Sequence, residues 1–115
     1  MYGSWNPENL ATRKIALGVV HQLAWGDKLM LSLVTMEPDA VVPTHSHPHE
    51  QMGILISGKI ELAIEQKVMP LAGNSMFLVP GMTLHALRAG PEGAVLVEAF
   101  SPPREEYKTA GPLLE

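Results

Sequence analysis

The sequence predicts an all-β fold, a small sandwich or barrel of short strands. Ten glycines and ten prolines in 115 residues interrupt the apolar runs at short intervals, which is typical of such folds. Helix signals, by contrast, are nearly absent. The chain is 46% hydrophobic and 17% charged, with no break in composition, so we expect one domain over residues 1–115.

Five short apolar or alternating runs give the expected strands. In chain order they are residues 29–36, 52–57, 59–65, 76–79 and 94–100. Ser57-Gly58, between the second and third runs, indicates a tight hairpin, and residues 70–74 indicate a turn that returns the chain. We expect the first ten residues and the tail after Pro102 to be extended or mobile.

Two kinds of strand surface are expected. In residues 59–65, isoleucine and leucine alternate with mostly polar residues, so this strand belongs to an outer sheet with one wet face. Residues 52–56 and 76–79 are apolar on both faces, as expected where one face lines a cavity and the other packs against a second sheet or a partner chain. Together with Trp5 and Trp25 in a chain of few aromatics, these strands predict a homodimer.

Composition excludes several classes of function. The chain has no cysteine, which excludes disulfides, thiolate zinc sites and cysteine nucleophiles, so a metal would need nitrogen and oxygen ligands. A net charge of -4 without a run of lysine or arginine argues against a nucleic-acid partner. The apolar stretch 15–20 is too short for a secretory signal core or a membrane span, so we expect a cytoplasmic protein with no membrane partner.

Histidines supply a candidate metal site. His45 and His47 are two residues apart, so in an extended strand both side chains project from one face. Gln51 follows four residues later, and His85 comes after a separate Pro-Gly turn. Three imidazoles and an amide oxygen suit one divalent transition metal, Mn, Fe, Ni or Zn, and leave positions open for water or substrate. A His-x-His pair alone would as readily be a solvated loop, and the two added residues favour the metal site.

Two further histidines are given other roles. His49 has the same parity as His47, but Pro48 and the turn that follows carry it away, so we expect it behind the ligands or at the surface. His21 has no partner at a useful spacing, and we expect an ordinary hydrogen-bonded or exposed histidine.

The metal motif resembles that of the cupin superfamily. The residues that carry the resemblance are His45, His47, Gln51 and Gly58 for the first cupin motif and Gly73, Pro80 and His85 for the second. The resemblance covers about residues 29–100 and implies a single-domain double-stranded β-helix, a jelly-roll barrel. Two positions depart from the pattern: Gln51 stands where the usual ligand is an acid, and the second motif reads Pro-Gly-x-x-x-His in place of Pro-x-Gly-x-x-His.

The run 98–107 is similar to the C-terminal segment of the small cupins of pectin degradation, which linearise 4,5-unsaturated uronates. In that family an acid, a phenylalanine and an arginine at about this spacing line the pocket, and the resemblance gives these roles to Glu98, Phe100 and Arg104. Glu98 replaces the aspartate expected there. The chemistry is coherent, because a metal can polarise the substrate oxygens, Glu98 can move a proton, and Arg104 can hold a carboxylate bidentately.

Ordinary roles compete with these. Glu98 is also explained as a strand carboxylate and Phe100 as a core residue. Arg104 is also explained as half of an ion pair with Glu105 or Glu106. Three functions therefore stay open: a metal-dependent lyase or isomerase-type enzyme acting on a small anionic sugar, a small metal dioxygenase of the quercetinase kind, and a non-catalytic sugar- or effector-binding cupin.

Overall fold

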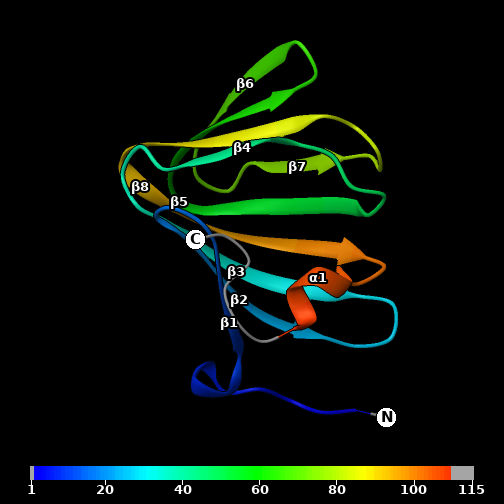
Figure 1. The fold of residues 1–115 in the computed structure, drawn as a ribbon. Helices are drawn as coiled ribbons and strands as arrows, with labels where there is room; N and C mark the ends of the chain where they lie inside the picture. Colours follow the sequence, from blue (N-terminus) through cyan, green and yellow to red (C-terminus); the bar gives the residue numbers. More distant parts are fainter. Residues whose placement is uncertain (1, 110–115) are drawn as a thin grey trace.

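The computed structural model describes residues 2–109, which form an almost entirely β structure (Figure 1). The strands are, in chain order, β1 (Ala11–Ala16), β2 (Val19–Trp25), β3 (Met30–Met36), β4 (Val41–His45), β5 (Glu50–Ile64), β6 (Lys67–Leu71), β7 (Met76–Val79) and β8 (His85–Ser101). A 3-10 turn (Pro7–Asn9) precedes them, and the short helix α1 (Glu105–Lys108) follows them. The predicted all-β class is confirmed.

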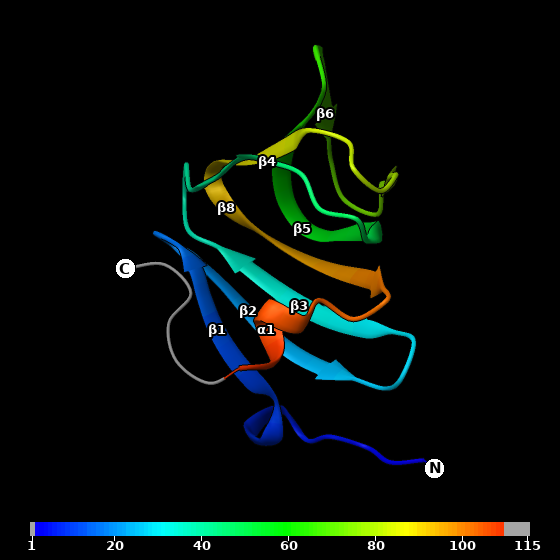
Figure 2. The same cartoon turned by 45° about the vertical axis from the view of Figure 1, so that its right-hand side comes forward.

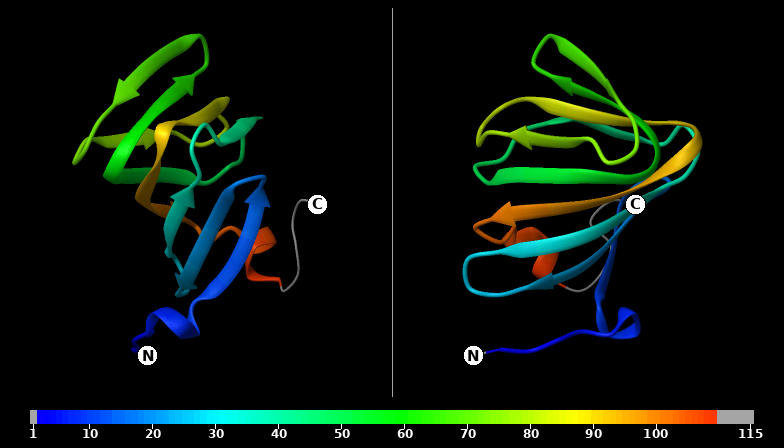
Figure 3. Two further views of the ribbon diagram at one scale, coloured as in Figure 1. Left: turned by 90° about the vertical axis from the view of Figure 1, so that its left-hand side faces the viewer. Right: turned by 180° about the vertical axis from the view of Figure 1, so that it is seen from behind.

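Two long strands, β5 and β8, run side by side and pass from one sheet layer into the other (Figures 2 and 3). One layer has the order β1-β2-β3-β8-β5-β7 and uses residues 94–101 of β8. The other has the order β4-β8-β5-β6 and uses residues 85–89 of β8. All pairings are antiparallel, and the result is a jelly-roll barrel with its interior between the two layers.

The predicted hairpin at Ser57-Gly58 is wrong, because both flanking runs belong to the single strand β5. The register of β5 against β8 shifts on either side of Gly58, as at a β-bulge, and a bulge bends a strand. Gly58 has φ +80, and a Cβ there would collide with the carbonyl oxygen of Gly93. A glycine within a strand-like run can mark a turn or a bulge. Gly58 lies at a bulge, where β5 bends and continues from one sheet layer into the other.

Several strand boundaries in the structure also differ from the expected ones. The expected strands 29–36 and 76–79 are confirmed as β3 and β7, whereas the run 94–100 is only the second half of β8. Strands β1, β2, β4 and β6 were not expected. The predicted turn over 70–74 begins later, since Pro70 lies in β6 and the Ser75 N–H donates to the Ala72 carbonyl at 3.0 Å.

Alternation along the strands separates the core from the surface. Ile60 and Leu62 are buried as predicted, and the neighbouring Glu61 is exposed. The two strands predicted to be apolar on both faces each bury one face, with side chains such as Phe77, while the other face stays exposed, with side chains such as Leu78. The largest fully buried apolar side chains are Phe100, Leu23, Met30, Leu55, Ile60, Leu62 and Leu96.

The chain after Pro102 packs on the barrel, so the prediction of an extended tail is wrong up to Thr109; residues 110–115 lie outside the described part. Tyr107 of α1 is buried. Arg13 of β1 holds this segment: its Nε donates to the Tyr107 carbonyl at 2.8 Å and its Nη2 to the Lys108 carbonyl at 3.0 Å. Residues 2–9 are exposed, and within residues 2–109 there is no helix of the length and apolarity that a membrane span requires.

Candidate metal centre

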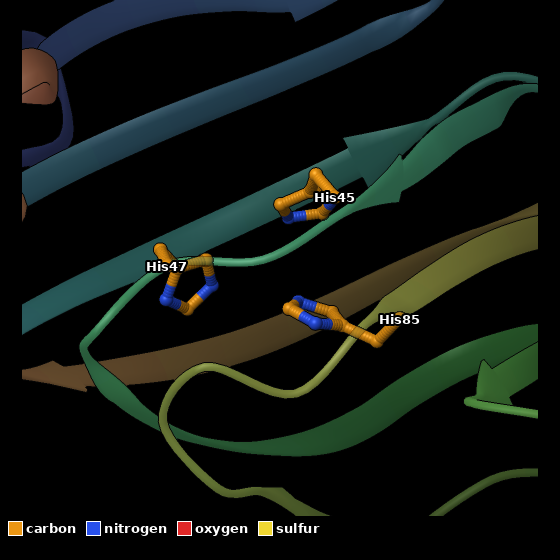
Figure 4. Close-up of side chains that lie close together, drawn as sticks. All are labelled: His45, His47 and His85. Carbon is orange, nitrogen blue, oxygen red and sulfur yellow. The ribbon is translucent and has the colours of Figure 1, made fainter.

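Three histidines converge inside one end of the barrel (Figure 4). His45 ends β4 and His85 begins β8, and the two are register partners in neighbouring strands. His47 follows in the loop between β4 and β5. One ring nitrogen from each lies within 4.8 Å of the others. The predicted convergence of residues far apart in the sequence is therefore a property of the barrel's strand pairing.

Each of these imidazoles has one nitrogen engaged and one free. The Nδ1 atoms of His45 and His85 each lie 2.8 Å from a backbone carbonyl, of Pro43 and Thr83 respectively. A carbonyl only accepts, so both Nδ1 atoms carry the proton and the Nε2 lone pairs are free, the tautomer that a metal ligand needs. Within residues 2–109, the buried His85 Nε2 has no hydrogen-bond partner.

Gln51 joins the histidines to an acid. The His47 Nε2–H donates to Gln51 Oε1 at 3.0 Å, and the buried His47 Nδ1 finds no hydrogen-bond partner in the described part of the chain. The amide nitrogen of Gln51 donates to Glu98 Oε2 at 2.6 Å. Glu98 therefore fixes the amide orientation and turns its oxygen toward the histidines. Buried nitrogens without partners and an oriented amide oxygen are a donor set that fits a divalent transition metal.

The electrostatics also favour metal binding over protonation. Burial, aided by the charge of Arg104, lowers the pKa of His47 to about 4. Burial lowers the pKa of His85 as well, against the opposing effect of its hydrogen bond to the Thr83 carbonyl. Both imidazoles are thus neutral at neutral pH, the form that coordinates a metal.

Glu98 is a buried carboxyl group with a raised pKa. It lies on the inner face of β8 and is 2% exposed. Burial raises its pKa to about 7, although the hydrogen bond from Gln51 and the charge of Arg104 both act to lower it. A carboxyl group with a pKa near the working pH can both take up and release a proton.

Arg104 and Phe100 lie beside this acid. The Arg104 guanidinium stacks on the rings of Tyr107 at 4.1 Å and Phe100 at 5.3 Å. It also pairs with Glu106 Oε2, through Nε at 3.1 Å and Nη2 at 2.9 Å. One of the two ion pairs considered from the sequence is thus present, while Glu105 pairs with Lys108 at 2.8 Å instead. Phe100 is 1% exposed and packs against the rings of His47 and Tyr107, each at 6.0 Å.

Two spaces that share several lining residues lie at the site, an inner cavity and a pocket at its mouth. The inner cavity, lined by His45, Gln51, His85, Glu98 and Arg104 among others, has only about 10 Å³ of free space, roughly that of one water. At the mouth, a pocket of about 370 Å³ is lined by Thr44, His45, Arg104, Glu106 and Tyr107, with Ile15, Val42 and Pro43. Of these two spaces, the mouth pocket is the one large enough for a sugar-sized ligand. A larger pocket of about 560 Å³ has no histidine in its lining.

The remaining histidines are both buried. His49 lies outside the cluster of three, with its ring 5.3 Å from that of His47. His21 is hydrogen-bonded as expected, with Nδ1 2.7 Å from Ser32 Oγ, but it also lines the inner cavity. Sequence reasoning missed Ser32 and Tyr107 as residues of this region.

Comparison with known proteins gives consistent results. Residues 32–100 match the family model described as a cupin domain. The chain is 28% identical to the pectin degradation protein KdgF of Dickeya dadantii over 86 residues, which are 74% of this chain and 78% of that protein. The structure of KdgF from a Halomonas species matches with a TM-score of 0.82 and 25% identity, over 91% of this chain and 98% of that one. A cupin of Shewanella frigidimarina described as RmlC-like matches with a TM-score of 0.84 and 23% identity, over 93% of this chain and 96% of that one.

Proposed function

The chain belongs to the cupin domain family, and from this premise we propose that it is a metal-dependent enzyme that opens 4,5-unsaturated uronates. The observation that carries the proposal is the buried hydrogen-bonded chain from His47 through Gln51 to Glu98, with the Arg104 guanidinium beside it. Similarity to proteins named for pectin degradation supports this substrate class. We also propose that residues 1–115 form one cupin domain.

The metal would be held by His45, His47, Gln51 and His85, whose neutral imidazoles and amide oxygen suit a divalent ion. When bound, the ion supplies a Lewis acid that polarises substrate oxygens and stabilises negative charge on them. Glu98 orients the amide of Gln51 from behind, as outer partners of metal ligands do.

The chain's own residues bind the substrate and move protons. Arg104 binds the substrate carboxylate in the mouth pocket, its guanidinium held in place by Phe100 and Tyr107. Ring opening removes the proton of the anomeric hydroxyl, breaks the bond from the anomeric carbon to the ring oxygen, and adds a proton to carbon 4, leaving an aldehyde and a ketone. Glu98 holds the proton between these two events, relayed through the single-water space of the inner cavity.

Loss of the substrate's double-bond absorbance on adding metal-loaded protein tests the proposal. Wild type should consume the absorbance, and chelation should stop it. Arg104→Ala should raise KM about 10- to 100-fold, the cost of losing charge-assisted hydrogen bonds to a carboxylate. No loss of absorbance with a fully occupied metal site would refute the function, and oxygen uptake or binding without turnover would then identify a dioxygenase or a binding protein.

We further propose a homodimer through the outer face of the layer that contains β3, β8, β5 and β7. Cross-strand pairing brings Leu31, Met52 and Leu78 into one row, and the next row brings Leu33 and Met76 together, all on the outside. These side chains are uncharged and between 37% and 69% exposed. A second copy fits best, because a neutral apolar face is complementary to itself across a two-fold axis.

A further inference from the structure

Arg104, to which the proposed function assigns the substrate carboxylate, already forms an ion pair with Glu106 of its own chain. Arg104 Nε and Nη2 both donate to Glu106 Oε2, at 3.1 and 2.9 Å. Both residues line the mouth pocket, beside His45. The acid therefore occupies the Nε–Nη2 edge of the guanidinium, an edge that can also pair with an incoming carboxylate.

The two partners of this ion pair differ in freedom. The Arg104 side chain is only 10% exposed and packs against the rings of Phe100 and Tyr107, so it is a fixed cation. The Glu106 side chain is 47% exposed, so it has room to turn into solvent. An incoming anion would therefore displace the glutamate and leave the arginine in place.

We propose that Glu106 is an internal competitor that an anionic substrate must displace from Arg104. The inference rests on the proposed function, in which Arg104 receives the substrate carboxylate. Neutral sugars cannot replace the charge of Glu106, so the exchange selects for anionic ligands. Because Glu106 is two residues from Arg104, the pair re-forms locally when a product leaves, and this speeds release.

Glu106→Gln tests the competition, because glutamine keeps the size and a hydrogen-bond acceptor but removes the charge. The probe is saturated galacturonate, which has the carboxylate but no double bond to react, and its affinity for metal-loaded protein is measured by calorimetry. The variant should bind galacturonate about three- to tenfold more tightly than wild type, the range expected for losing a partly exposed ion pair. Glu105→Gln is the matched control, because Glu105 pairs with Lys108 outside the pocket lining, and it should bind as wild type does.

Two comparisons make the result specific. Galactose, which lacks the carboxylate, should show no gain with Glu106→Gln. In an Arg104→Ala background the same substitution should change galacturonate affinity by less than about twofold, because Glu106 can compete with the ligand only when Arg104 is present. For the unsaturated substrate, Glu106→Gln should lower KM, because the substrate carboxylate no longer has to displace the glutamate from Arg104.

Unchanged, weaker or undetectable galacturonate binding by Glu106→Gln would overturn the inference and assign Glu106 to positioning Arg104. This outcome is distinct from failure of the proposed function. Wild type that does not consume the unsaturated uronate refutes the enzyme, whereas the galacturonate affinities still report on Glu106. Turnover together with unchanged galacturonate binding refutes the competitor alone.

Discussion

Buried His21 should make the protein lose stability in mild acid. The side chain is 2% exposed, with Nδ1 2.7 Å from Ser32 Oγ, and burial together with the charge of Arg104 lowers its pKa from 6.5 to about 3. The unfolded chain therefore takes up a proton at His21 near pH 6.5 while the folded chain does not. Above pH 6.5 His21 therefore does not lower the free energy of unfolding. Below pH 6.5 the free energy of unfolding falls as the pH drops toward the folded pKa.

The size of this loss depends on how far the pH lies below 6.5, the pKa of His21 in the unfolded chain. Going from about pH 7.5 to about pH 5 spans roughly 1.5 units below the unfolded pKa, so the free energy of unfolding should fall by about 2 kcal/mol from His21 alone. The figure is nearly the same if the folded pKa is 4, because pH 5 lies above both values.

Urea unfolding of chelator-treated protein at the two pH values measures this loss. His21→Gln removes the titration and keeps a group that can hydrogen-bond to Ser32. The variant should lose about 2 kcal/mol less than wild type between the two pH values, whatever its stability at pH 7.5. An identical pH dependence in both proteins would refute the reasoning, since every other titrating group, including the metal-site histidines, is shared.

Three further predictions concern the site and the assembly. His47→Ala should abolish metal binding in a protein that still folds, checked by metal analysis and circular dichroism; an unchanged metal stoichiometry would remove His47 from the site. Glu98→Gln should lower kcat about 10²- to 10⁴-fold, the usual contribution of general acid–base catalysis, and a kcat near that of wild type would exclude Glu98 as the proton carrier. Leu78→Glu should convert a dimer to a monomer in sedimentation experiments, because two buried carboxylates would face each other's apolar surface; a dimer that persists would place the interface elsewhere.

The sequence was most informative where spacing alone determines chemistry. The grouping of His45, His47 and His85 was predicted from two short motifs, and the barrel brings their nitrogens within 4.8 Å. The strands 29–36 and 76–79 were also predicted closely, because apolar runs bounded by turn residues are a local signal. Metal-ligand motifs and apolar runs can both be recognised from a few neighbouring residues.

Pairing between distant segments could not be predicted. From the sequence, Gly58 is compatible with either a turn or a bulge. Its close approach to Gly93 on β8, a residue distant in the sequence, distinguishes the two. His21 has no partner at a useful spacing in the sequence because its hydrogen-bond partner Ser32 comes from the next strand. A local signal did exist, since Val19, His21 and Leu23 alternate as the inward residues of β2, and this would have turned His21 toward the interior.

The tail was misjudged for a similar reason. Terminal segments are commonly extended or mobile, but Tyr107 supplies one large apolar group that the barrel buries. The binding partner of the tail, Arg13, lies in a strand that was not expected.

Two of the three hydrogen bonds of Arg13 hold the Tyr107 and Lys108 carbonyls, so they fix the segment that follows Arg104 against β1. The metal-site histidines and Gln51 all precede Arg104 in the chain, and the segment that follows Arg104 docks on β1. A chain interrupted before Arg104 would keep the proposed metal ligands and lack the cation proposed to bind the substrate carboxylate. Nascent or clipped molecules should therefore bind metal and discriminate poorly between charged and neutral sugars.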